Sequence, residues 1–61
     1  MSPYEYKHER QRRGLTQAAL AAQLGIPRES VSRRENGTQK ITQEAALAIQ
    51  ALPVPRKRSG D

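Results

Sequence analysis

The sharpest contrast along this chain is between a mostly apolar segment, residues 16–24, and the polar segment that follows it. The apolar segment has the composition of a packed helix: Ala18, Ala19, Leu20, Ala21, Ala22 and Leu24. Thr16 is suited to cap its start, and Gly25 ends it because glycine adopts a left-handed backbone without steric cost. The small side chains of Ala21 and Ala22 would let another helix approach closely. The pattern therefore predicts a short packed helix that ends in a tight corner.

The polar segment, residues 28–36, predicts a second helix with a different role. Ile26 and Val31 are its main apolar contributions, and Asn36-Gly37 ends it. Four polar residues fall on one face by their helical spacing: Arg28, Glu29, Ser32 and Arg33. A helix with so little apolar surface cannot be a core helix. We therefore expect it to present this polar, mostly basic face to a partner.

A third helix is predicted near the amino terminus, from about residue 3 to residue 13. Ser2, Pro3 and Glu5 have the spacing of a capping box with proline at the first helical position. Gly14 ends this helix, and Tyr6 is its expected core anchor. Its other charged residues are expected to form a solvated face: Lys7, Glu9 and Arg12.

A fourth helix is predicted from Thr42, its N-cap, to the residues before Pro53, with Glu44 favourably placed in the first turn. One stripe is expected to close the core over the helices predicted at residues 3–13 and 28–36: Ala45, Ala48, Ile49 and Leu52. The other apolar residues would be exposed in a monomer: Ala46, Leu47 and Ala51. Because an exposed apolar patch often marks a partner surface, these three are candidates for a dimer interface.

The expected fold is all-α, with four helices in one domain over residues 1–52, since no alternating β-branched run indicates a strand. A chain of 61 residues allows one small domain. A core of Leu, Ile, Val and Ala would stabilise a domain of this size by roughly 3–5 kcal/mol. Residues 53–61 contain two prolines and no periodicity, and we expect them to form a disordered basic tail.

The net charge of +5, from eleven Lys and Arg against six Asp and Glu, suits a phosphate backbone, although many small proteins are basic. Three residues of the tail would add to non-specific nucleic-acid binding: Arg56, Lys57 and Arg58. The chain has no cysteine and a lone histidine, His8, so no metal site or cofactor is indicated. No apolar run of about 20 residues, signal peptide, nucleophile–base pair or phosphate-binding glycine loop is visible. We expect a cytoplasmic protein that is not an enzyme and binds no membrane or small molecule.

Two motifs of the chain carry a family resemblance. They read Leu15-Thr16-Gln17-x-x-Leu20-Ala21-x-x-Leu24-Gly25-Ile26 and Val31-Ser32-x-x-Glu35-x-Gly37. Together they resemble the helix-turn-helix of the phage repressor and Cro (XRE-type) family, and the likeness covers roughly residues 6–52. The resemblance implies a four-helix lambda-repressor-like domain. In chain order its second and third helices, here residues 16–24 and 28–36, form the helix-turn-helix and are called helix 2 and helix 3 below. It also implies double-stranded DNA as the partner, with helix 3 in the major groove.

By position in the family motif, the resemblance implies these groove-facing residues: Pro27, Arg28, Glu29, Ser32 and Arg33. It likewise implies these phosphate contacts: Gln17, Asn36, Thr38 and Lys40. Arg28 and Arg33 are the expected base readers, because arginine donates two hydrogen bonds to guanine O6 and N7. Glu29 could accept from cytosine N4 or pair with Arg33 four residues on, and we favour the second, orienting role.

Three further expectations come from the resemblance and from departures from it. Arg10 and Glu35 stand where lambdoid repressors place an ion pair, so we expect them to form a largely buried pair. Pro27 replaces the Ser or Thr that usually caps helix 3, so the cap is lost and the helix entry could shift by a residue. Arg34 replaces an apolar residue at the core edge, and we expect its stem to pack while its guanidinium reaches solvent or a phosphate.

One such helix spans only a few base pairs, so useful specificity needs two copies on half-sites about 34 Å apart. We therefore expect a homodimer, at least on DNA, bound to a pseudo-palindromic operator. The leading hypothesis is a sequence-specific transcription regulator: a repressor of a phage, prophage or small bacterial operon, at the nucleoid of a bacterial or infected host cell. The alternative is an antitoxin-like or accessory protein that binds a protein partner and autoregulates its own operon.

Overall fold

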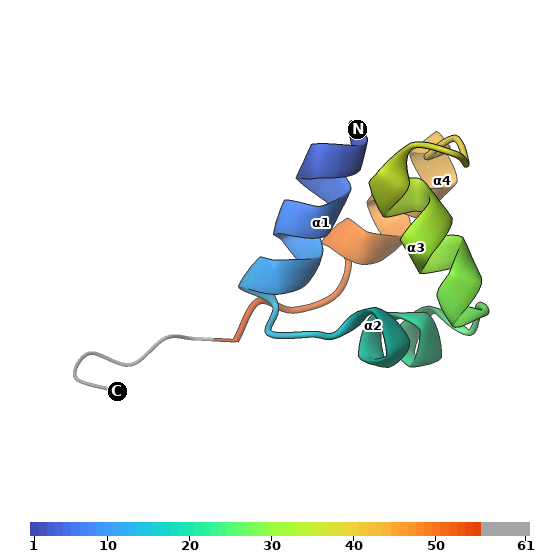
Figure 1. The fold of residues 1–61 in the computed structure, drawn as a ribbon. Helices are drawn as coiled ribbons and strands as arrows, with labels where there is room; N and C mark the ends of the chain where they lie inside the picture. Colours follow the sequence, from blue (N-terminus) through green and yellow to red (C-terminus); the bar gives the residue numbers. More distant parts are fainter. Residues whose placement is uncertain (56–61) are drawn as a thin grey trace.

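The computed structural model describes residues 1–55, which form four helices joined by short connections and contain no strand. The helices are α1 (Pro3–Arg12), α2 (Gln17–Leu24), α3 (Arg28–Asn36) and α4 (Gln43–Gln50). Figure 1 shows α1 and α3 side by side, with α2 packed below α3 and α4 against α1. The all-α, four-helix fold predicted from the sequence is confirmed.

Arg56, Lys57 and Arg58 lie outside the described residues, as does the rest of the predicted basic tail from residue 56 onward. Within residues 1–55, no helix is long and apolar enough to cross a membrane.

Side-chain caps start three of the four helices where the sequence predicts them. The Ser2 hydroxyl accepts a hydrogen bond from the Glu5 backbone N–H at 3.0 Å, and the Glu5 carboxylate accepts one from the Ser2 N–H at 2.8 Å. The Ser2 backbone N–H, together with its hydroxyl, lowers the pKa of Glu5. The Thr16 and Thr42 hydroxyls cap α2 and α4 in the same manner. Each such cap typically contributes about 1 kcal/mol to helix stability.

The core lies where the inward faces of the four helices meet. Its fully or nearly fully buried members are Tyr6, Leu20, Ala21, Val31 and Ile49. A ring of partly buried aliphatic residues packs against them: Leu15, Leu24, Ile26, Ile41 and Leu52. Tyr6 is the core anchor that the sequence predicted, with no exposed surface.

Two alanines predicted to face inward, Ala22 and Ala48, are exposed instead. The reason is that each short helix buries only a narrow stripe. In α4 the stripe is Ala45 and Ile49, one turn apart, and Ala48 is rotated by about 100° from Ile49. In α2 the buried residues are Leu20 and Ala21, and the neighbouring Ala22 lies outside this stripe.

Arg13 is a buried cation that joins the ends of α1 and α4. It follows α1, which ends one residue earlier than predicted, and only 6% of it is exposed. Its guanidinium donates to the Leu52 carbonyl at 2.9 Å, to the Glu9 carbonyl at 2.8 Å and to the Glu9 carboxylate at 2.6 Å. It also approaches the Gln50 carbonyl at 3.4 Å, so it meets the negative end of the α4 dipole.

The prediction that Glu9 belongs to a solvated face is therefore wrong. Its side chain is 18% exposed, and the hydrogen bond from Arg13 lowers its pKa. Arg12 pairs with Glu9 at 3.2 Å but keeps about half of its side-chain surface, 49%, in solvent. The Glu9–Arg13 spacing of i, i+4 is the one sequence signal that would have indicated this pair.

Candidate nucleic-acid interface

The corner between α2 and α3 sets the direction of α3. Gly25 adopts a left-handed conformation, with φ of 69°, which a residue with a Cβ would adopt only with strain. The next N–H, from Ile26, donates to the Ala21 carbonyl at 3.0 Å and closes the end of α2. Val31, fully buried, then fastens α3 to the core. The result is the helix–corner–helix arrangement that the motif predicts.

With Val31 turned inward, α3 leaves its polar side outward. The residues predicted to face a DNA groove are exposed, except for Ser32, which is half-buried: Pro27, Arg28, Glu29, Ser32 and Arg33. The orienting ion pair predicted between Glu29 and Arg33 is absent from the described structure, which pairs other residues instead. Both side chains are exposed, and an exposed pair gains little over solvation. Glu29 therefore does not hold Arg33 in the free protein.

The start of α3 shows the consequence of Pro27. This residue occupies the N-cap position without a side-chain hydrogen bond, as its departure from the family pattern predicts. Its carbonyl still accepts from the Ser30 N–H at 3.0 Å, and the helix begins at Arg28. The helix start therefore shows no shift.

The inner side of α3 is held by a polar network around Glu35. The Arg10 guanidinium donates to the two carboxylate oxygens of Glu35 at 2.6 and 3.1 Å, and to the Leu15 carbonyl at 2.8 Å. The two side chains are 12% and 5% exposed, so this is the largely buried ion pair that the resemblance implied. Gln17, at the start of α2, also donates to Glu35 at 3.2 Å. Glu35 thus ties α3 to both α1 and α2.

This contact defines what Gln17 could offer a phosphate. An amide nitrogen carries two hydrogens, so the bond to Glu35 uses one and leaves the other. The backbone N–H groups of the first turn of α2 point in the same direction as the helix dipole.

The other predicted phosphate contacts follow α3 in a tight turn. The Asn36 side-chain oxygen accepts from the Thr38 N–H at 3.1 Å and from the Thr38 hydroxyl at 2.7 Å. The N–H groups of Thr38 and Gln39 both donate to the Arg33 carbonyl. Since the only hydroxyl hydrogen of Thr38 is engaged, the donors that remain for a phosphate are the Asn36 amide and the Lys40 ammonium, both on exposed residues.

Arg34 is half-buried, and its guanidinium packs against Tyr6 of α1, a contact that the sequence did not predict. One nitrogen donates to the Tyr6 hydroxyl at 2.9 Å, and the guanidinium carbon lies 5.6 Å from the ring centroid. Tyr6 offers both an acceptor and a π-face, and this combination attracts a cation into the helix interface.

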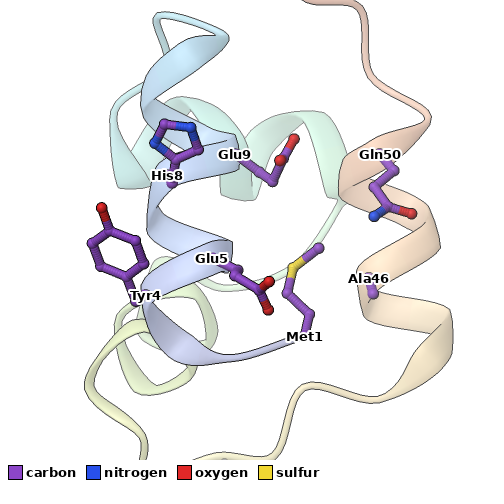
Figure 2. A pocket seen from close by; sticks show the side chains of 7 residues that line it. All are labelled: Met1, Tyr4, Glu5, His8, Glu9, Ala46 and Gln50. Carbon is purple, nitrogen blue, oxygen red and sulfur yellow. The ribbon is translucent and has the colours of Figure 1, made fainter.

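A groove of about 440 Å³ lies between α1 and α4. Figure 2 shows Glu5 and Glu9 pointing from α1 into this groove, opposite Ala46 and Gln50 of α4. Ala46, predicted to be exposed, is half-buried because it forms one wall of the groove. Two carboxylates repel a phosphate backbone, so the groove is no candidate for DNA. Residues 1–55 also bring together no set of three side chains that could hold a metal ion.

These features define a small, all-helical helix-turn-helix domain, in which α2 and α3 form the motif and α3 exposes a basic face. A sequence comparison agrees, since the model of the helix-turn-helix family matches residues 7–52. The chain belongs to the XRE-type helix-turn-helix family and is a DNA-binding transcription regulator of that type. No curated protein and no solved structure gives a significant match to it.

Proposed function

We propose that this protein is a sequence-specific repressor of a phage, prophage or small bacterial operon, which acts at the nucleoid and inserts α3 into the major groove of its operator. The observation that carries the proposal is the division of α3 into two sides. One side is fixed by Val31 and Glu35, while Arg28 and Arg33 are exposed on the other. A rigid helix with two exposed arginines suits the reading of guanine O6 and N7.

Phosphate contacts at both ends of the motif would set the register of α3. Gln17 and the first turn of α2 would bind one phosphate, and Asn36 and Lys40 would bind another, while Thr38 holds the Asn36 side chain in its turn. Gln17 is held by Glu35, and Asn36 is held by its turn, so these donors are ordered before DNA arrives. Ser32 is small enough to let the helix sit deep, while Glu29 and Pro27 face the same groove.

The proposed operator has two half-sites, each bound by one copy of the protein. The apolar surface on α4 supports this part, because Leu47 is 56% exposed and Ala51 is exposed beside it. Ala46, at the groove wall, continues this surface toward Tyr4, which is 78% exposed. We propose that Ala46, Leu47 and Ala51 contact a second copy on DNA.

A binding selection from random duplex DNA tests the function directly. We expect two symmetric half-sites whose centres lie about 10 base pairs apart, each with at least one G·C pair. Selected half-sites composed only of A·T pairs would rule out Arg28 and Arg33 as guanine readers. A pool that remains random after selection would rule out sequence-specific recognition altogether.

Two substitutions separate base reading from phosphate contact. Arg33→Ala should weaken binding to the selected site by about 1–3 kcal/mol and relax preference at one base pair, because it removes a bidentate contact. Lys40→Ala should weaken binding to all sequences alike and lower the salt slope by about one. Lys7→Ala, an exposed lysine on α1, is the matched control and should change neither quantity. Equal effects of the first two variants on selected and random DNA would contradict this assignment.

Leu47→Gln tests the second copy. It removes an exposed apolar side chain from α4, so it should reduce cooperative filling of the two half-sites while leaving binding to a single half-site unchanged. Val54→Gln is the matched control, since Val54 is also exposed, at 42%, and is not part of the proposed interface. Sedimentation with and without the operator measures the stoichiometry. One copy per operator, or unaltered cooperativity in the Leu47 variant, would exclude this interface.

A further inference from the structure

Two polar contacts join α1 and α3, and they run in opposite directions. Arg10 of α1 donates to Glu35 of α3, and Arg34 of α3 donates to the Tyr6 hydroxyl of α1. Arg34 and Glu35 are adjacent, while Tyr6 and Arg10 are four residues, or about one helical turn, apart. The two contacts therefore attach the carboxyl-terminal half of α3 to two positions of α1, about one turn apart.

An arginine at position 34 costs free energy in the interface between α1 and α3. Its Nε is buried and has no hydrogen-bond partner, and no carboxylate in residues 1–55 forms an ion pair with it. Leucine or methionine at position 34, together with phenylalanine at position 6, would fill the same interface with no buried polar group to satisfy. An apolar side chain, however, could not form a directional hydrogen bond. Arg34 binds one defined atom, the hydroxyl of a tyrosine that has no exposed surface and is held by the core.

We propose that Arg34 is a positioning residue for DNA recognition. With Tyr6, it fixes the angle at which α3 leaves α1, and so it places Arg28 and Arg33 in the groove. The proposal rests on the proposed function, in which α3 reads base edges.

The angle between α1 and α3 matters because Arg28 lies far along α3 from the residues that anchor the helix. Arg28 lies six residues from Arg34, which is about 9 Å along the helix. With Glu35 as the only polar anchor to α1, α3 could tilt about that point, and a tilt of about 10° would move the backbone of Arg28, about 10 Å away, by roughly 1.8 Å. Hydrogen bonds lose most of their strength over such a displacement, and a bidentate contact to guanine requires two at once. The second anchor removes this freedom.

Arg34→Met and Tyr6→Phe test the proposal separately and together. Each removes one partner of the contact and keeps the apolar bulk, so the fold is expected to persist. Each single variant should lower the ratio of selected-site to random-site affinity by about tenfold, the loss typical of one base contact. The double variant should lose no more than either single one. The salt slope should stay unchanged, because Arg34 faces Tyr6 rather than a phosphate. Arg12→Met removes an equal charge from an exposed position and should leave the ratio unchanged.

The angle between α1 and α3, measured by residual dipolar couplings in the free protein, gives a readout that does not require DNA. We expect it to change in both single variants. An unchanged angle, or an unchanged affinity ratio in Arg34→Met beside a wild type that does select a sequence, would overturn the proposal. A lower salt slope with equal losses on both DNAs would also overturn it, since Arg34 would then be a phosphate contact. If the wild type selects no sequence but the angle changes, the proposed function fails while the placement of α3 by Arg34 stands.

Discussion

Replacing Arg13 with methionine probes the contact that joins the carboxyl-terminal ends of α1 and α4. Methionine keeps most of the apolar stem but removes the guanidinium. The change deletes three short hydrogen bonds, of 2.6 to 2.9 Å, to the Glu9 carboxylate and to the carbonyls of Glu9 and Leu52. It also removes the positive charge from the negative end of α4.

The expected loss of stability follows from those bonds. A hydrogen bond that involves a charged group contributes roughly 1.5–3 kcal/mol, but water can satisfy part of what is exposed. We therefore expect Arg13→Met to lower the free energy of unfolding by about 2–3 kcal/mol. Since a domain of this size is stabilised by roughly 3–5 kcal/mol in total, the variant should be close to unfolding at room temperature.

Thermal and urea unfolding followed by circular dichroism measure the effect. We expect the Tm of Arg13→Met to fall by roughly 10–20 °C, since 1 kcal/mol corresponds to about 4–8 °C in a small domain. Arg12→Met is a matched control on the adjacent, half-exposed residue, and it should cost at most about 1 kcal/mol. Unfolding free energies of the two variants that agree within about 0.5 kcal/mol would contradict this prediction, because burial of the Arg13 contacts would then add nothing to stability.

Two further predictions concern the charged contacts of α1. The hydrogen bond from Arg13 lowers the pKa of Glu9 from 4.5, so the ionised form stabilises the fold; this contribution is present above about pH 4.5 and is lost as the pH falls through the lowered value. Acid unfolding of the wild type should therefore be steeper below pH 4.5 than that of Glu9→Gln, and parallel titrations would contradict this. Arg10→Met should cost about 3–5 kcal/mol, because it leaves the Glu35 carboxylate buried with only Gln17 as a side-chain partner. This loss equals the whole stability expected of the domain, so circular dichroism at room temperature should show a largely unfolded variant. The double variant Arg10→Met, Glu35→Met should recover most of that loss, and equal stability of wild type and Arg10→Met would show that the carboxylate finds another partner.

The helices were predictable because their signals are local. The capping box of Ser2 and Glu5 and the threonine caps act within three residues, and the structure contains each of them. The division of α3 into an apolar and a polar side was also readable, since Val31 is buried and Arg33 is exposed. Helical spacing does not show how wide the buried stripe of a helix is. The predicted burial of several alanines in α2 and α4 was therefore wrong.

The candidate site was predictable to a similar degree. Its groove-facing set follows from helical spacing and family likeness, and the structure keeps those side chains accessible. The Arg10–Glu35 pair was predictable only from the family resemblance, because local sequence patterns do not connect residues that far apart. The contact of Gln17 with Glu35 was not expected, and it limits what Gln17 has left for a phosphate.

The helix boundaries and the polar side of α3 follow from the local sequence, because capping and helical periodicity depend on neighbours along the chain. The roles of three arginines that look alike in the sequence depend instead on how the helices pack. Arg10, Arg13 and Arg34 reach partners 25, 39 and 28 residues away, at Glu35, Leu52 and Tyr6 respectively. An arginine can be solvated, can pair with a carboxylate or can stack on an aromatic ring. The outcome depends on which groups the packed helices bring within about 3 Å of its guanidinium, and only folding establishes those neighbours.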